Sequence, residues 1–247
     1  MQKQSIIKKC RALLQAYEGG KLGQTRMPED TSPDFSGKDK ELQLAYFTLP
    51  MSLNYQRNSY KLWEAALKTF QDKETNKVFN VSEASALSAG ELKNYLMKYK
   101  LALQPNKHID TWHRIVKTVQ ENWGPLTDLL KSVDYDFLNL RDIIQKRHKK
   151  GFPYLSGPKI FNYWASILQR YCDVKLKNAE HIEIALDTHV LKCSVLLGVI
   201  TQEEADNLSK EKIYERWREV LAGSSIKPAD MHTPLWFWSR NGFLFKI

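Results

Sequence analysis

The stretch that decides the fold is residues 148–159, which read His-Lys-Lys-Gly-Phe-Pro-Tyr-Leu-Ser-Gly-Pro-Lys. A polar, basic helix expected over 137–147 ends just before it, and its prolines and glycines predict a short turn. A second helix is expected over 157–171, because Pro158 suits a first helical turn. Apolar residues then recur on one side of that helix, at Ile160, Tyr163, Trp164, Ile167 and Leu168. The stretch therefore predicts two helices joined by a tight hairpin, and the alternative is an ordinary corner with solvated lysines.

Apolar residues recur at helical spacing through most of the chain, whereas alternating strands are few. Ser88 and Asp110 are expected to cap helices at 89–99 and 111–122, and a short helix is expected at Ser82-Glu83. Loops are expected at 19–38, 50–56 and 223–234, before an aromatic tail. The other expected helices are 3–17, 39–49, 57–72, 125–132, 187–198, 201–209 and 210–222. Helices this numerous and short predict a compact all-α protein.

The composition limits the class of protein further. The 247 residues suffice for one large domain or two small ones, and 43% hydrophobic residues indicate a globular chain. No apolar run reaches membrane-spanning length, and the basic N-terminus lacks the apolar core of a secretory signal. A net charge of +9 favours a polyanionic partner, nucleic acid first and an anionic membrane second.

The cysteines indicate a reducing compartment. Cys10, Cys172 and Cys193 are odd in number and far apart, which fits reduced thiols of a cytosolic protein better than disulfides. Because the chain has no Cys-x-x-Cys pair, the sequence gives no case for a structural zinc ion or an iron–sulfur cluster.

A second informative stretch, residues 184–190, reads Ile-Ala-Leu-Asp-Thr-His-Val. An apolar run leads into Asp187, and a helix is expected to follow it, so Asp187 is placed as an N-cap. A carboxylate fixed there could also stabilise positive charge on a sugar, or orient and deprotonate an attacking group. Both readings stay open on these residues alone.

Taken in order, the basic helix, the turn at 152–159, the helix after it and Asp187-Thr188-His189-Val190 resemble the signature of the helix-hairpin-helix DNA glycosylases. The resemblance covers about residues 140–200. It implies two helical subdomains that flank a basic cleft, with the hairpin motif followed by a catalytic Asp loop. The expected division of the single domain 1–247 is 1–60 plus 200–247 as one subdomain and 61–199 as the other.

The resemblance also implies roles for individual residues. Asp187 would be catalytic, and Lys159 is the candidate for the nucleophile of strand-cleaving members. Lys159 could instead contact phosphate only, because Tyr154 replaces the usual first glycine of the hairpin and the register is shifted by one residue. DNA contacts are expected from the hairpin and the run before it, at Lys149, Lys150, Gly151, Tyr154, Ser156 and Gly157.

A glycosylase must also fill the gap left by an extruded base and hold that base in a pocket. The loop at 49–57 lies where the superfamily places its gap-filling residues, and Asn54, Gln56 and Arg57 suit that role; a plain polar loop is the alternative. The expected pocket residues are Trp112, His113, Trp236 and Trp238, although tryptophans at helical spacing usually pack in cores.

The sequence thus predicts a monomeric, cytoplasmic, nucleoid-associated DNA glycosylase, with lyase activity left open. It would act on double-stranded DNA, away from membranes, and without cofactor or metal. The resemblance favours an oxidised purine such as 8-oxoguanine as substrate. The chain lacks the four-cysteine loop of an iron–sulfur cluster, and the length of the segment between Lys159 and Asp187 is closest to that in the archaeal 8-oxoguanine glycosylases. Alkylated bases, or bulky modified bases of phage genomes, are the other substrates considered. Two other classes stay open: a non-catalytic DNA-binding module and a helical protein-interaction domain.

Overall fold

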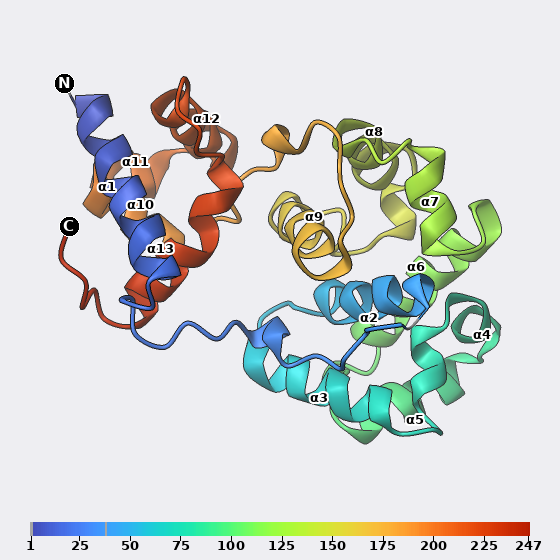
Figure 1. Ribbon diagram of the computed structural model, residues 1–247. Helices are drawn as coiled ribbons and strands as arrows, with labels where there is room; N and C mark the ends of the chain where they lie inside the picture. The colour runs from blue at the N-terminus through green and yellow to red at the C-terminus, as the bar shows by residue number, and fades with distance from the viewer. Residues whose placement is uncertain (1, 38) are drawn as a thin grey trace. The chain divides into compact units, whose positions relative to one another are not determined.

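The computed structural model describes residues 2–37 and 39–247, and it is built from helices throughout (Figure 1). Helical residues make up 66% of the structure, and the described residues contain no strand, only an isolated bridge between Asp136 and Lys177. The prediction of an all-α protein is therefore confirmed. The chain divides into two compact units, a central unit of Met27–Ala179 and a terminal unit of the residues up to Arg26 with Glu180–Ile247.

The boundaries of these units differ from the division near residues 60 and 200 that the sequence suggests. Residues 27–60 belong to the central unit, because α2 (Lys40–Ser52) packs against α9 (Pro158–Cys172). The stretch 180–199 belongs to the terminal unit, because α10 (Thr188–Leu197) packs against α13 (His232–Arg240). The chain therefore leaves one compact unit and returns to it after completing the other.

Helix α2 forms the centre of the central unit, since every residue from Leu44 to Ser52 is buried. A helix buried on all sides must be surrounded by other elements, and the rings of Tyr46 and Phe47 lie against Trp63 of α3 (Ser59–Gln71). Glu41 of α2 also accepts the backbone amides of Leu126 and Thr127, at 2.7 and 2.8 Å. The remaining helices of this unit are α4 (Val81–Ala86), α5 (Ala89–Lys98), α6 (Lys107–Asn122), α7 (Leu126–Ser132) and α8 (Phe137–Asp142).

Several helix ends differ from those predicted. Ser88 caps α5 with a reciprocal bond to Glu91, as predicted. The prediction that Asp110 is a cap is wrong: α6 begins at Lys107, and Asp110 lies in its first turn, 2.8 Å from Arg114. Aspartate is favoured both at caps and in first turns, where it faces the positive helix end, so its presence alone did not fix the start. Helix α2 likewise continues through Pro50 to Ser52.

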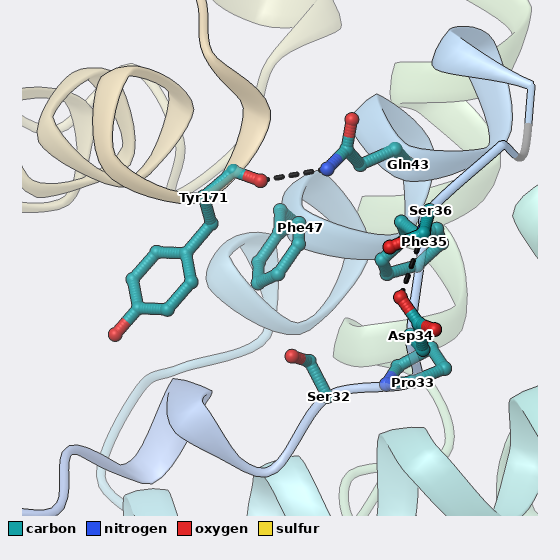
Figure 2. A pocket seen from close by; sticks show the side chains of 8 residues that line it. All are labelled: Ser32, Pro33, Asp34, Phe35, Ser36, Gln43, Phe47 and Tyr171. Carbon is teal, nitrogen blue, oxygen red and sulfur yellow. Dashed lines mark hydrogen bonds between the residues drawn. The ribbon is translucent and has the colours of Figure 1, made fainter.

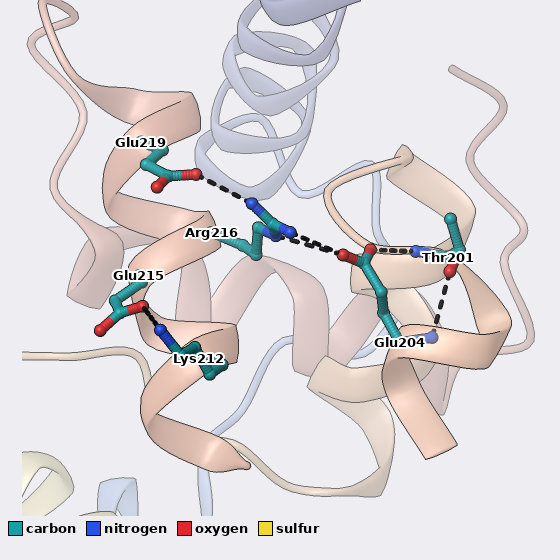
Figure 3. Close-up of polar contacts among 6 residues, drawn as sticks. All are labelled: Thr201, Glu204, Lys212, Glu215, Arg216 and Glu219. Carbon is teal, nitrogen blue, oxygen red and sulfur yellow. Dashed lines mark hydrogen bonds and ion pairs between the residues drawn. The ribbon is translucent and has the colours of Figure 1, made fainter. Parts of the chain in front are cut away.

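The terminal unit consists of α1 (Gln2–Glu18), α10, α11 (Gln202–Asn207), α12 (Lys210–Leu221) and α13. Helix α1 packs against α12 and α13, and the Tyr17 ring stacks on Phe237. Figure 3 shows how α12 is tied to the start of α11: Arg216 pairs with Glu204 at 2.9 Å, and Glu204 caps back onto Thr201. The aromatic tail, which the sequence left without structure, forms α13 and supplies core to this unit.

Two further expectations concern the whole chain. Among the residues that the structure describes, no helix has both the length and the apolar character needed to cross a membrane. The cysteines Cys10, Cys172 and Cys193 are free and buried, which confirms the prediction of unpaired thiols. Burial raises the pKa of each thiol to about 12, so the thiolate is disfavoured.

Candidate nucleic-acid interface

The hairpin predicted at 148–159 forms a compact turn in the central unit. After α8 the helix widens by one residue, so that the amide of His148 reaches back to the carbonyl of Ile143 at 2.8 Å. A short turn at Lys149–Gly151 follows, and Phe152 and Leu155 are then fully buried. Gln145 also donates to the carbonyl of Ser156 at 3.1 Å. These anchors fix the turn, so its remaining residues are presented on a rigid support.

Tyr154 takes the place of a glycine in the motif and also adopts a conformation typical of glycine. Its φ of +58° lies in the left-handed region of backbone conformation, which residues other than glycine rarely adopt. The Tyr154 ring stacks on Tyr55, with centroids 5.1 Å apart and planes 28° apart. The predicted gap-filling loop and the hairpin, far apart in the sequence, thus lie together on the central unit.

The start of α9 is open to a ligand. Gly157 occupies the cap position without a side-chain bond, and Pro158 has no amide hydrogen. The next two amides, of Lys159 and Ile160, have no acceptor among the described residues. Free amides at a helix start, reinforced by the helix dipole, attract phosphate oxygens. The half-exposed Lys159 side chain pairs with no described residue and adds a positive charge beside them.

The basic run before the hairpin separates into two kinds of charge. Lys146 and Arg147 both pair with Asp142, at 3.4 and 2.5 Å. Lys149 and Lys150 are exposed and form no ion pair with a described residue. Only these two lysines of the run therefore present unneutralised charge beside the turn.

The two hairpin glycines that are predicted to contact DNA, Gly151 and Gly157, lack room for a side chain for different structural reasons. A Cβ on Gly151 would come within 2.3 Å of the Thr118 hydroxyl, so the turn approaches α6 too closely for a side chain. A Cβ on Gly157 would lie 3.1 Å from the carbonyl of Tyr154. Ser156 and Gly157 use their amides within the turn, bonding the carbonyls of Phe152 and Tyr154 at 2.9 Å each. The amides of Ser156 and Gly157 are therefore occupied within the turn, unlike those of residues 159 and 160.

The loop at 53–58 contains residues with different environments. Gln56 is exposed at φ +49°, and Tyr55 is 40% exposed. Asn54 accepts from the Ser59 hydroxyl at 3.1 Å. Arg57 is instead directed into the protein and donates to the carbonyls of Leu101 and Lys100, at 2.6 and 3.1 Å. Its predicted role beside an orphaned base is not supported, because these carbonyls already occupy its guanidinium.

Arg57 joins this loop to a second loop, between the helices expected at 89–99 and 111–122, for which the sequence predicted no functional role. Leu103, two residues after the Arg57 acceptor at 101, is 49% exposed. The amide of Leu103 donates to His108 at 3.1 Å, and burial together with the Arg57 charge lowers the pKa of His108 to about 4. A neutral imidazole therefore acts as the acceptor that holds this loop. The sequence shows a leucine at position 103 in this loop, but it does not show that the side chain is exposed.

Asp187 lies in the terminal unit, where it caps α10 as predicted. One carboxylate oxygen accepts the Val190 amide at 2.9 Å, and the other has no partner among the described residues. The side chain is half-buried. The neighbouring His189 contacts the hydroxyl of Ser239 in α13 through Nδ1 at 3.0 Å, so its partner is in that helix and not in the hairpin. Asp187 thus has one oxygen committed to the fold and one available.

The expected pocket residues do not form one group. Trp112 of the central unit is fully buried, and its indole nitrogen donates to the carbonyl of Val78 at 2.9 Å. It is a core residue, so the expectation of a pocket role for Trp112 is wrong. His113 follows it on α6, half-buried, and burial lowers the pKa of its imidazole.

The other two tryptophans belong to α13 in the terminal unit. Trp238 is 5% exposed and donates to the carbonyl of Phe245 at 2.8 Å, so it closes the chain end against the helix. Trp236 is half-buried, with the Arg240 guanidinium 4.8 Å from its ring centre and the His189 ring 5.9 Å away. Trp236 is the one of the four that combines partial exposure with proximity to the Asp187 helix.

Among the described residues, no cluster of three or more His, Cys, Asp or Glu side chains could hold a metal ion. Comparisons of the chain with family models, curated proteins and solved structures found no match.

Proposed function

We propose that this protein is a DNA glycosylase of the helix-hairpin-helix type, which extrudes a modified base and hydrolyses its glycosidic bond. The observation that carries the proposal is the stacking of Tyr55 on Tyr154. Two segments that the sequence assigned separately to DNA binding meet in this contact. The unpaired lysines Lys149 and Lys150 flank the same turn.

The proposed DNA contact follows from the chemistry of the turn. The amides of Lys159 and Ile160 would bind a phosphate, and Lys149 and Lys150 would neutralise its neighbours. Such contacts position a duplex without reading its sequence. Tyr55 and Leu103, both exposed, supply the flat and apolar side chains that can enter a base stack where a nucleotide has left it.

Asp187 is the proposed catalytic carboxylate. Loss of the base leaves positive charge on the deoxyribose, and the free oxygen of Asp187 can stabilise that charge or accept the proton of an attacking water. The base departs with the bonding electron pair and takes up a proton. If Lys159 attacks instead, its amine must first lose a proton; it then displaces the base at C1′, the sugar ring opens between C1′ and O4′ with a proton taken up by O4′, and the resulting Schiff base allows strand cleavage.

The proposed substrate is a modified purine in double-stranded DNA, with 8-oxoguanine first and alkylated or bulky modified bases next. The substrate is identified by direct assay. We expect the full chain to release a free base from one duplex in a panel that carries single oxidised, alkylated or phage-type bases. Release would be followed by chromatography of the free base, and unmodified duplex is the control.

Two results would contradict the proposal. Salt-dependent DNA binding without base release from any duplex would make the protein a non-catalytic binding module. Absence of salt-dependent DNA binding would leave the charge without a nucleic-acid role. Borohydride trapping on the abasic site that base release leaves in the DNA tests the lyase step separately. A covalent adduct that persists in Lys159→Gln would exclude Lys159 as the nucleophile.

A further inference from the structure

A half-buried guanidinium links the two loops of the central unit that carry the exposed side chains Tyr55 and Leu103. Arg57 donates from Nη1 to the carbonyl of Leu101 at 2.6 Å and from Nη2 to the carbonyl of Lys100 at 3.1 Å. Both acceptors are backbone carbonyls, and no carboxylate of a described residue pairs with Arg57. Burial lowers the pKa of Arg57 to about 10, so the side chain keeps its charge at pH 7.

The loop that Arg57 grips is fixed at both of its ends. The amide of Ala102 donates to the carbonyl of Leu96 in α5 at 2.7 Å, and the amide of Leu103 donates to Nδ1 of His108 in α6 at 3.1 Å. Leu101 and Ala102 are buried, whereas Leu103 is 49% exposed. The loop therefore presents one apolar side chain to solvent from a fixed backbone.

The loop of Tyr55 is fixed on its other side. The Tyr55 amide donates to the carbonyl of Leu53 at 2.9 Å, and the Tyr55 ring stacks on Tyr154 of the hairpin. Arg57 follows Tyr55 by two positions. A continuous series of contacts thus runs from the hairpin through Tyr55 and Arg57 to the loop of Leu103.

The contacts of Arg57 are kept at a cost in stability. Gln56 and Lys100, which flank its two bonds, have φ values of +49° and +62°, where residues with a Cβ are strained. Nε of Arg57 and Nε2 of His108 are buried without a partner among the described residues. Because Nδ1 of His108 accepts the Leu103 amide, Nε2 of the neutral ring carries the proton, so these two donors cannot bond each other. Strain and unpaired donors destabilise a fold, so positioning of the two loops explains the arrangement better than stability does.

We propose that Arg57 is a positioning residue for base extrusion, which holds the Leu103 loop to the Tyr55 loop so that both side chains enter the duplex together. This inference rests on the proposed glycosylase function. Arg57 acts through Leu103 and not on DNA, since two carbonyls already occupy its guanidinium. Side chains that are held in place in advance lose less conformational entropy when they fill the space of an extruded base.

The first test replaces Arg57 with Met, which keeps an unbranched side chain and removes both bonds. On the duplex that the parent excises best, the single-turnover rate of base release should fall at least about fivefold, the smallest effect expected when one stacked side chain is lost. The affinity for that duplex should change less than about twofold, and the slope of log K against log salt should stay the same, because no phosphate contact is lost. A slope less negative by about 0.9 would place Arg57 on a phosphate and overturn the proposal.

The matched control is Gln43→Met. Like Arg57, Gln43 donates across the central unit to a backbone carbonyl, that of Tyr171, at 2.7 Å (Figure 2). Its loss should leave base release at the parental rate. Arg57→Lys keeps the charge but not the fork of two donors, so it should not restore the rate. Restoration by lysine would show that charge alone suffices, against the proposal.

A double-mutant cycle with Leu103→Ala separates positioning from a general effect on stability. Leu103 is exposed, so its truncation leaves the fold intact and keeps the test decisive even if Arg57→Met unfolds. If Arg57 acts through Leu103, the double variant should lose no more rate than the more impaired single variant. Losses that multiply in the double variant, or a parental rate in Leu103→Ala, would contradict the proposal.

A spectroscopic measurement follows extrusion without the chemical step. In an Asp187→Asn background, 2-aminopurine beside the modified base reports by its fluorescence when its neighbour leaves the stack. The fluorescence should rise on binding, also with Gln43→Met added, and the rise should be lost with Arg57→Met added. A parent that releases no base from any duplex would remove the proposed function and this inference with it. Parental base release and an undiminished fluorescence rise in folded Arg57→Met would remove this inference alone.

Discussion

Glu29 is an acidic side chain only 2% exposed, and its environment ties the stability of the protein to pH. Burial raises the pKa of Glu29 to about 7, although the bond from Tyr163 and the nearby Arg170 charge oppose that rise and Asp30 adds to it. The folded state therefore binds this proton more tightly than the unfolded chain, where the pKa is near 4.5. The contribution of Glu29 to the free energy of unfolding is therefore fully present below about pH 4.5, and it is lost as the pH rises through 7.

We predict that Glu29→Gln removes this pH dependence. The amide mimics the protonated carboxyl and keeps an acceptor for Tyr163. The variant should match the parent near pH 4.5 and exceed it at pH 8, by up to about 3 kcal/mol in the free energy of unfolding. Urea unfolding at the two pH values measures this, and parallel profiles for parent and variant would refute the assignment.

Tyr154 shows how one position carries both a strain and a compensating contact. Its left-handed backbone costs roughly 1 kcal/mol for a residue with a Cβ, and the stack on Tyr55 returns a similar amount. We predict that Tyr154→Ala, which keeps the strain and loses the stack, is less stable than Tyr154→Gly by about 1 kcal/mol. Thermal unfolding compares the two, and an equal or reversed order would show that the backbone there is unstrained.

At the scale of residues, local chemistry could be predicted and long-range partners could not. The caps Ser88 and Asp187 follow from residue type and position before an apolar helix. The stack of Tyr55 on Tyr154 and the capture of Arg57 by the carbonyl of Leu101 join distant segments. Nothing in the neighbouring sequence of either residue indicates its partner.

At the scale of elements, the hairpin is the part that sequence analysis placed best. The turn and the start of α9 lie where glycine and proline predicted them, whereas the helix before the turn is α-helical only to Asp142 and widens over Ile143–Arg147. Two elements were misjudged: α2 runs through Pro50, and the tail forms α13. Tertiary burial decides both, since α2 is the central helix of its unit and α13 packs on α1 and α10.

Lys149 and Lys150, the unpaired lysines of the basic run, make a quantitative prediction about DNA binding. If each neutralises one phosphate, the double variant Lys149→Ala/Lys150→Ala should make the slope of log K against log salt less negative by about 1.8. The matched control is Lys131→Ala/Lys177→Ala, since these lysines pair with Asp128 and Asp134 in the same unit. Fluorescence anisotropy over a salt series gives both slopes. Equal slopes for the two double variants would place the DNA elsewhere.

At the scale of the whole molecule, the structure is all-helical, and the net charge of +9 is the property that led us to propose a polyanionic partner. The fold class could be predicted because apolar residues recur at helical spacing along the chain. The division into units was misplaced, because it depends on the packing of α2 on α9 and α10 on α13. Such packing is set by the shapes of whole helix faces, which spacing alone does not describe.

The central claim is that Asp187 acts in chemistry as well as in capping α10. Asparagine caps a helix as well as aspartate does, so Asp187→Asn should keep the bond to Val190 and fold like the parent. The matched control is Asp136→Asn, which changes a cap of the same geometry on α8, bonded to Asn139 at 2.9 Å.

The decisive measurement is the single-turnover rate of base release by these two variants on the duplex that the parent excises best. We predict that Asp187→Asn loses at least about a hundredfold in rate while its DNA affinity is retained, and that Asp136→Asn excises like the parent. Excision by Asp187→Asn at the parental rate would contradict the account.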